Sequence, residues 1–121
     1  LCVGYGLSAI MGEEEVMEHL QNQLEAGLTN VDSKKVVVAY EPAWAISNGD
    51  PYKTKAVETP DHAERICMFI RIKFKVSKVL YGGSTNALNA ESFLERQIDG
   101  LLVGGASLRP DEFNKMITIK I

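Results

Sequence analysis

Short apolar runs alternate with longer amphipathic stretches along the whole chain. The apolar runs lie at positions 1–3, 36–40, 78–81 and 100–103. Runs this short and continuously apolar are typical of strands covered on both faces, as parallel strands are. The repeated order of strand, loop and helix therefore predicts parallel strands joined by right-handed crossovers.

The amphipathic stretches predict four helices. In the first, apolar residues recur at every fourth position and form one stripe, while Glu, Gln and Asn occupy the opposite face. Thr59 and Pro60 form a strong start for the second, as N-cap and first helical residue. The predicted helices cover 13–28, 60–70, 90–94 and 111–116.

Four strand-helix units predict an α/β fold. A complete (β/α)8 barrel needs roughly 200 residues, and this chain has 121. The chain also starts inside an apolar run rather than ahead of one. We therefore expect residues 1–121 to form a single domain, about half of a barrel, within a longer chain or a multi-chain assembly.

Composition and charge narrow the class of protein. Hydrophobic residues make up 45% of the chain and the formal net charge is -3, which indicates a globular chain without the clustered positive face of a nucleic-acid binder. No apolar run approaches the ~18 residues of a membrane span. Cys2 and Cys67 lie in apolar segments and are expected to be buried free thiols. These features favour a cytoplasmic protein with no nucleic-acid or membrane partner.

Glu41 is the sharpest candidate for chemistry. It directly follows the run 36–40, and ligands of parallel α/β proteins bind at the carboxyl ends of the strands. Partial burial there would raise the proton affinity of the carboxylate, which suits a base acting on a carbon acid. An isolated acid at a strand end is more often a solvated or ion-paired loop residue, and only its neighbours in the sequence favour the base.

Two pairs of glycines follow the last two strands. Gly82-Gly83-Ser84 and Gly104-Gly105 place small residues where the backbone can approach an anion and donate N–H groups to it. One such pair usually marks only a turn. Two pairs after consecutive strands favour a phosphate site.

The remaining candidates are weaker. Trp44 is either a core-packing aromatic or the anchor of a mobile loop, and periodicity cannot separate the two. His19 and His62 fall on predicted helices and are expected at the surface. Nothing resembles a metal constellation, a nucleophile elbow or a nucleotide-binding phosphate loop, so we predict no metal and no cofactor.

Three stretches of the chain resemble the triosephosphate isomerase family. Residues 38–46, Val-Ala-Tyr-Glu-Pro-Ala-Trp-Ala-Ile, resemble the signature around that family's catalytic glutamate and the start of its lid. Residues 80–84 and 99–108 resemble its seventh and eighth strands with their loops. The resemblance covers the chain as strands five to eight of a TIM barrel.

This resemblance implies specific roles. Glu41 would move a proton between the two carbons that distinguish dihydroxyacetone phosphate from glyceraldehyde 3-phosphate, a step of glycolysis and gluconeogenesis. Backbone N–H groups of four residues would hold the phosphate: Ser47, Ser84, Gly104 and Gly105. The lid would begin with Pro42, Ala43, Trp44, Ala45 and Ile46.

The departures from the family matter as much. Its lid usually reads Gly-Thr-Gly-Lys, where this chain has Ser47-Asn48-Gly49-Asp50, which would alter lid closure. The family's asparagine, lysine and histidine have no counterpart here, and neither does its second glutamate. The resemblance therefore implies a complementary N-terminal half-barrel as partner, a homodimer when complete, and weak or absent activity for the chain alone.

Two other interpretations stay open. The chain could be a non-catalytic half-barrel that acts as a structural or assembly subunit. It could also belong to another phosphate-binding barrel enzyme, such as a pentose phosphate epimerase, although Glu41 within Glu-Pro-Ala-Trp argues against that.

Overall fold

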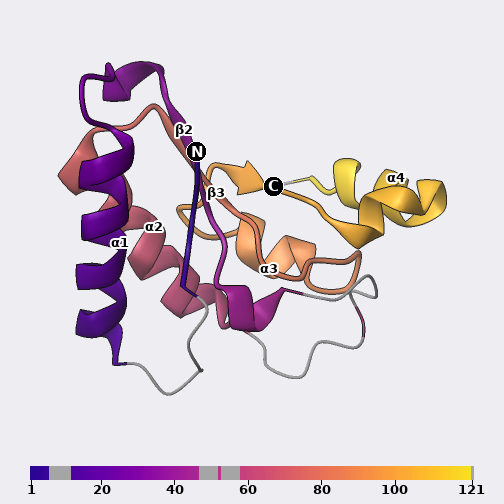
Figure 1. The fold of residues 1–121 in the computed structure, drawn as a ribbon. Coiled ribbons are helices and arrows are strands. Elements are labelled where there is room, and N and C mark those ends of the chain that lie inside the picture. The colour runs from indigo at the N-terminus through magenta and orange to yellow at the C-terminus, as the bar shows by residue number, and fades with distance from the viewer. Residues whose placement is uncertain (6–11, 47–51, 53–57, 121) are drawn as a thin grey trace.

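The computed structural model describes residues 1–5, 12–46, 52 and 58–120 (Figure 1). Strands and helices alternate through this part of the chain, as the sequence predicts. The elements are β1 (Cys2–Val3), α1 (Glu13–Gly27), β2 (Val37–Tyr40), α2 (Pro60–Phe74), β3 (Lys78–Tyr81), α3 (Ala90–Leu94), β4 (Gly100–Leu101) and α4 (Pro110–Ile117).

The four strands form one parallel sheet in the order β1-β2-β3-β4. In this register Tyr40 pairs with Tyr81, and Tyr81 pairs with Leu101. All four strands therefore end at the same edge of the sheet. The predicted α/β class with parallel strand-helix units is confirmed.

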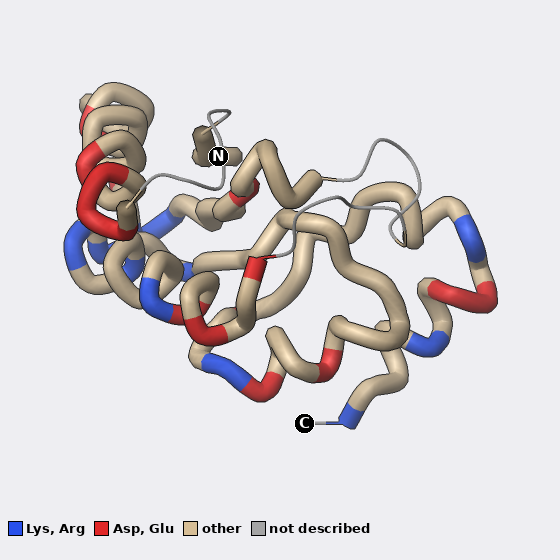
Figure 2. The backbone as a smooth tube through the Cα atoms, turned by 90° about the horizontal axis from the view of Figure 1, so that it is seen from below, with Lys and Arg blue, Asp and Glu red and all other residues tan. Residues whose placement is uncertain are grey.

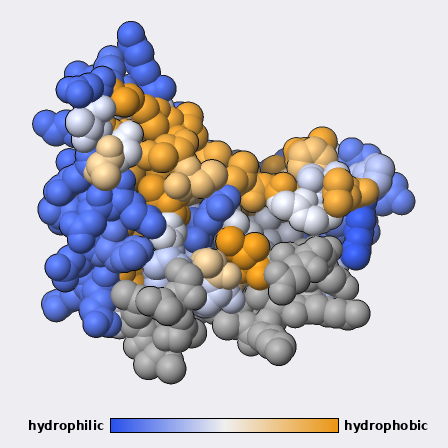
Figure 3. Space-filling view, in the orientation of Figure 1, coloured by the Kyte–Doolittle hydropathy of each residue, from blue (hydrophilic) through white to orange (hydrophobic). Residues whose placement is uncertain are grey.

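The two faces of the sheet differ in burial. Tyr40 and Tyr81 point toward the helices and are 0% and 1% exposed, because successive side chains of a strand alternate between faces. Val37, on the opposite face of β2, is 44% exposed. Figure 3 shows apolar surface gathered over the sheet, between α1 and α4. The helices thus cover one face, and no helix that the structure describes covers the other, open face.

The helices follow the predicted pattern closely. The α1 stripe packs into the main core, where Val16, Leu20 and Leu24 are fully buried. The Thr59 side chain caps α2 by accepting a hydrogen bond from the N–H of His62 at 3.2 Å. Figure 2 shows charged residues spread around the outside of the molecule, with α1 carrying acidic residues but no Lys or Arg.

Several local details differ from the sequence-based expectations. One-turn 3-10 helices lie at Ser33–Lys35, Ala43–Ala45 and Gly105–Leu108, since turns this short leave no periodic signal. Both cysteines are free, but Cys2 is exposed rather than buried, because it lies on the open face of the sheet.

Among the helices that the structure describes, none is both long and apolar enough to cross a membrane.

Candidate active site

Glu41 continues β2 at the edge where the parallel strands end. Its N–H donates to the carbonyl of Val3 at 2.7 Å, which keeps it in the sheet ladder. Since side chains alternate along a strand, the Glu41 carboxylate lies on the face opposite to Tyr40. The backbone approach is close: a methyl group at Gly4 would lie 1.8 Å from the carbonyl oxygen of Glu41. Only glycine fits at position 4.

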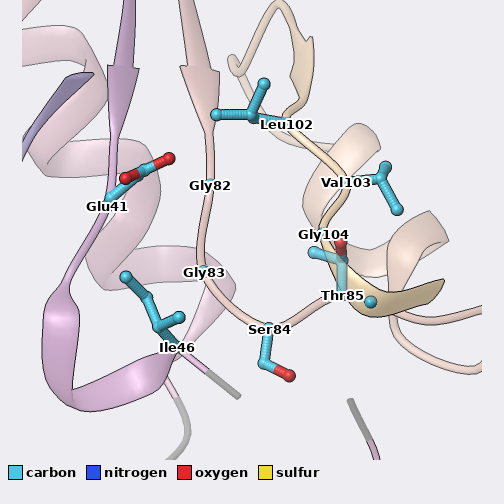
Figure 4. Close-up of a pocket in the computed structure, with 10 residues that line it drawn as sticks. Glu41, Ile46, Gly82, Gly83, Ser84, Thr85, Leu102, Val103 and Gly104 are labelled. Atoms are coloured by element: carbon cyan, nitrogen blue, oxygen red, sulfur yellow. The ribbon is translucent and has the colours of Figure 1, made fainter. Parts of the chain in front are cut away.

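The Glu41 side chain lies over Gly82 of the neighbouring strand end. A methyl group at Gly82 would lie 2.6 Å from Cγ of Glu41 and 3.1 Å from its Oε1. Figure 4 shows the carboxylate directed across toward Gly82. The absent side chain of Gly82 therefore creates the space that the carboxylate occupies.

Glu41 and both glycine pairs border a single pocket of about 330 Å³. The pocket lies between the segments that follow β2, β3 and β4 (Figure 4). Its lining residues are Glu41, Ile46, Gly82, Gly83, Ser84, Thr85, Leu102, Val103, Gly104 and Gly105. A carboxylate and two stretches of bare backbone thus face a space large enough for a small anionic substrate.

Ser84 reaches this pocket with its backbone already engaged. Its N–H donates to the carbonyl of Ala45 at 2.8 Å. This bond ties the segment after β2 to the segment after β3. An anion that took the Ser84 N–H would have to replace the Ala45 carbonyl. Ser47, the other predicted donor of this kind, lies outside the described residues.

Three of the five residues predicted to begin the lid pack into the protein. Pro42 and Ala45 are buried, and Trp44 packs against the main core. Ala43 is exposed, and Ile46 is 42% exposed and lines the pocket. Of the two interpretations of Trp44, the structure shows the core contact, and its role as a hinge anchor stays a prediction.

Sequence reasoning missed three pocket residues, Thr85, Leu102 and Val103. The Thr85 hydroxyl is buried and has no hydrogen-bond partner among the residues that the structure describes. The sequence predicted Leu102 and Val103 only as residues of the fourth strand, which ends at Leu101 in the structure, and nothing in the sequence singles out an ordinary threonine at position 85.

Cys2 is a further neighbour of Glu41 that the sequence did not reveal. Partial burial and the adjacent Glu41 carboxylate raise the pKa of the Cys2 thiol, and that carboxylate accepts a hydrogen bond from it. The thiol is therefore a protonated donor rather than a nucleophile. Strand pairing of Cys2 with Ala39 brings the two side chains together.

His62 is not the solvated surface residue that the sequence suggested. Its side chain is 21% exposed, and its Nδ1 lies 2.8 Å from the carboxylate of Glu58, itself only 2% exposed. The helix pattern could not reveal this contact, because Glu58 lies before the helix begins.

Comparison with known proteins agrees with this geometry. The family model described as triosephosphate isomerase matches residues 1–120. The chain belongs to the triosephosphate isomerase family. Curated triosephosphate isomerases align over nearly all of it, with 42% identity over 98% of the chain for the protein of Mesomycoplasma hyorhinis. Those of Mycoplasmopsis pulmonis and Synechocystis are each 40% identical, over 98% and 99% of the chain.

The chain spans about half the length of these triosephosphate isomerases, between 46% and 48% of each relative. The family membership and the half-length match confirm the resemblance to one half of a TIM barrel.

Proposed function

We propose that this chain supplies the catalytic base and the phosphate-binding backbone of a triosephosphate isomerase. The observation that carries the proposal is the pocket in which the Glu41 carboxylate faces the glycine pairs 82–83 and 104–105. A base and an anion-binding backbone must lie one small molecule apart to act on a phosphorylated three-carbon substrate. The pocket of about 330 Å³ satisfies that requirement.

The proposed reaction interconverts dihydroxyacetone phosphate and glyceraldehyde 3-phosphate. Glu41 removes a proton from the carbon next to the carbonyl, the C–H electron pair forms the carbon–carbon double bond of the enediolate, and the π pair of the carbonyl moves onto its oxygen. The protonated Glu41 then returns the proton to the former carbonyl carbon, while the hydroxyl proton of the neighbouring carbon is transferred to the former carbonyl oxygen and a new carbonyl forms at that neighbouring carbon. Glu41 is unchanged at the end. Glu41 lies over Gly82, which has no side chain that could stand between the carboxylate and the substrate.

The phosphate would be held by backbone donors. We assign the N–H groups of Gly104, Gly105 and Ser84, and that of Ser47, as its ligands. Because the Ser84 N–H is bonded to Ala45 here, phosphate binding at Ser84 would release Ala45. Binding would thereby be coupled to movement of the segment after β2, which carries Pro42, Ala43, Trp44, Ala45 and Ile46 as the proposed first part of the lid.

Full activity would require the other half of the barrel. The charge that develops on the enediolate oxygen needs preorganised hydrogen-bond donors, which the family resemblance assigns to the N-terminal half. Each outer strand of the described sheet, β1 and β4, pairs on one side only. We propose that a complementary N-terminal half-barrel covers both edges, on the same chain or a second one, and that the completed barrel forms a homodimer.

Glu41 substitutions in the completed barrel test the proposal. We expect isomerisation by the wild type, and a loss of about 10²–10⁴-fold in kcat for Glu41→Asp and Glu41→Gln, since general bases contribute this much. Glu95→Gln, at an exposed glutamate after α3, is the matched control and should retain full activity. The assay follows triose phosphate interconversion with a coupled dehydrogenase.

Two outcomes would contradict the proposal. Unchanged turnover in Glu41→Gln would remove Glu41 from the mechanism. No turnover by the wild-type completed barrel would favour the non-catalytic half-barrel subunit instead.

A further inference from the structure

Glu58 is a buried carboxylate that the proposed reaction does not use. It is 2% exposed and directly precedes Thr59, the N-cap of α2. A carboxylate is costly to bury unless its oxygens accept hydrogen bonds. Its surroundings therefore need an explanation.

Three donors surround the Glu58 carboxylate. The hydroxyl of Tyr40 donates to Oε2 at 3.1 Å, and the N–H of Thr59 donates to Oε1 at 2.9 Å. Nδ1 of His62 lies 2.8 Å from both oxygens, so the proton of the imidazole belongs on Nδ1. Both carboxylate oxygens are satisfied, one of them by the residue that directly precedes Glu41.

Two charged side chains lie beyond His62. Its Nε2 lies 3.9 Å from Oε2 of Glu13, at the start of α1, and Arg65 binds the same oxygen at 2.9 Å. Through its own hydrogen bonds, Glu58 connects β2 to the first turn of α2.

The charge on Glu58 also acts on the tyrosines beneath the pocket. Burial and then the Glu58 carboxylate raise the pKa of Tyr40, and both also raise the pKa of Tyr81. Both phenols stay protonated, so Tyr40 remains a donor to Glu58. The side chains of Tyr40 and Tyr81 lie on the helix side of the two strand ends from which Glu41 and Gly82 follow.

The hydrogen bond between Tyr40 and Glu58 affects the position of the Glu41 side chain, because Tyr40 and Glu41 are adjacent in the strand. Adjacent side chains of a strand point to opposite faces, so a rotation of the strand end that moves the Tyr40 ring must also move the Glu41 carboxylate. Tyr40 is fully buried, and its ring lies 6.4 Å from that of Tyr81 between centroids. Fixing its hydroxyl at Glu58 fixes the direction in which Glu41 leaves the strand.

We propose that Glu58 is a positioning residue that aims the catalytic carboxylate of Glu41 through its hydrogen bond to Tyr40. The inference rests on the proposed function for its effect on turnover. The positioning effect itself involves only Tyr40, Glu41 and Glu58, all of which the structure describes. Loss of the Tyr40–Glu58 hydrogen bond allows the Glu41 carboxylate to shift, and a displacement of about 1 Å can cost about 10²-fold in rate. The glycine pairs that would hold the phosphate do not take part in this hydrogen bond.

The test uses the completed barrel with Glu58→Ala, Glu58→Gln, Tyr40→Phe and the double variant Tyr40→Phe with Glu58→Ala. We expect kcat to fall about 10-fold or more in Glu58→Ala and Tyr40→Phe, with KM within about twofold of the wild-type value. The double variant should be no slower than the worse single variant, because each single change already breaks the Tyr40–Glu58 bond. Glu58→Gln keeps an oxygen that accepts from Tyr40 and should recover most of kcat.

Ile70→Val is the matched control for lost stability, since Ile70 is a fully buried residue of α2, the helix that Glu58 precedes. It should lower the melting midpoint and leave kcat unchanged. Full kcat in folded Tyr40→Phe, or independent losses that multiply in the double variant, would overturn the inference.

A second readout on the same samples needs no turnover. The side-chain carboxyl carbon of Glu41 is followed by ¹³C NMR in the wild type, Tyr40→Phe and Glu58→Gln. We expect the Glu41 signal to shift or broaden in Tyr40→Phe and to stay near its wild-type position in Glu58→Gln. If the wild type has no isomerase activity, the proposed function fails while this signal still decides the inference. An unchanged Glu41 signal in Tyr40→Phe would overturn it.

Discussion

Glu41 makes close contacts with two neighbours, Gly4 and Gly82, that have no side chain. Gly4 allows the end of β1 to meet the Glu41 carbonyl, and Gly82 leaves room for its carboxylate. Thr85 shows the opposite case, a hydroxyl that is present and buried without a described partner. Adding a methyl group at Gly82 or removing the hydroxyl of Thr85 should therefore change activity or stability measurably.

Gly82→Ala should displace the carboxylate without unfolding the sheet. The new methyl group would lie 2.6 Å from Cγ of Glu41, and a side chain can move more readily than a backbone. We expect kcat of the completed barrel to fall roughly 10²-fold, as measured in the isomerase assay. Gly12→Ala adds a methyl group that meets no atom within 4 Å among the residues that the structure describes, and it is the control. Equal activities of the two variants would show that the Glu41 position is not critical.

Thr85→Val should stabilise the chain. Valine has the shape of threonine and removes a buried hydroxyl that has no partner among the described residues. Relief of that desolvation is worth about 1 kcal/mol, which a urea unfolding curve resolves. Thr29→Val removes a hydroxyl that donates to the carbonyl of Glu25 at 2.8 Å and should destabilise instead. A destabilised Thr85→Val would mean that the hydroxyl has a partner in solution.

Strands and helices of this chain are joined by one carboxylate at the opposite end of the sheet from the pocket. Asp99 precedes β4 and accepts from Arg71 of α2 at 2.7 Å and from the N–H of Val79 in β3 at 2.8 Å. Lys78 adds a contact at 3.4 Å. The side chain is 19% exposed, so these bonds are only partly screened. Asp99 therefore holds three elements in register.

Asp99→Asn should weaken the fold in a pH-dependent way. Partial desolvation acts to raise the pKa of Asp99, but the Val79 N–H, Arg71 and Lys78 outweigh it and lower the pKa below its ordinary value. A lowered folded-state pKa gives stability that is present above about pH 4 and is lost as the pH falls through the folded-state value. We expect a loss of about 1–3 kcal/mol at pH 7, which shrinks toward pH 2.

The control for Asp99 is Asp61→Asn. Asp61 pairs with Arg96 at 2.7 Å but is 67% exposed, so its removal should cost at most about 1 kcal/mol. Urea unfolding at several pH values measures both variants. A pH-independent loss in Asp99→Asn would show that its charge does not contribute to stability.

At the scale of the whole molecule, the main feature is the exposed apolar face of the sheet. Val37 is 44% exposed and Leu102 is 40% exposed on this face, and Figure 3 shows the apolar surface between the outer helices. Exposed apolar surface of this kind usually marks an interface. The proposed N-terminal half-barrel would cover it, together with the edges of β1 and β4.

Binding of a hydrophobic dye should report this surface. We expect the isolated chain to enhance the fluorescence of anilinonaphthalene sulfonate, and a stoichiometric amount of the complementary half-barrel to suppress most of that signal. An unrelated folded protein of similar size is the control. Dye fluorescence that persists in the mixture would contradict closure of the barrel by the second half.

Much of the architecture was predictable because local patterns encode it. The stripe of α1, the cap Thr59 and the apolar run of β3 each act within a few residues, and the structure has all of them at the predicted places. The family and the half-barrel fold followed from the motifs around Glu41 and the glycine pairs, and the family match confirms both. The roles assigned to Glu41, Ser84, Gly104 and Gly105 stay predictions.

The sequence by itself determined the elements, their parallel order and the strand ends where chemistry is possible, since periodicity, caps and glycines act locally. Only the tertiary structure decided which side chains meet. Glu58 contacts Tyr40 across 18 positions, Cys2 meets Glu41 across a strand pair, and the Ser84 N–H is engaged by Ala45. Such contacts depend on sheet register and helix packing, which bring together residues that no spacing along the chain connects.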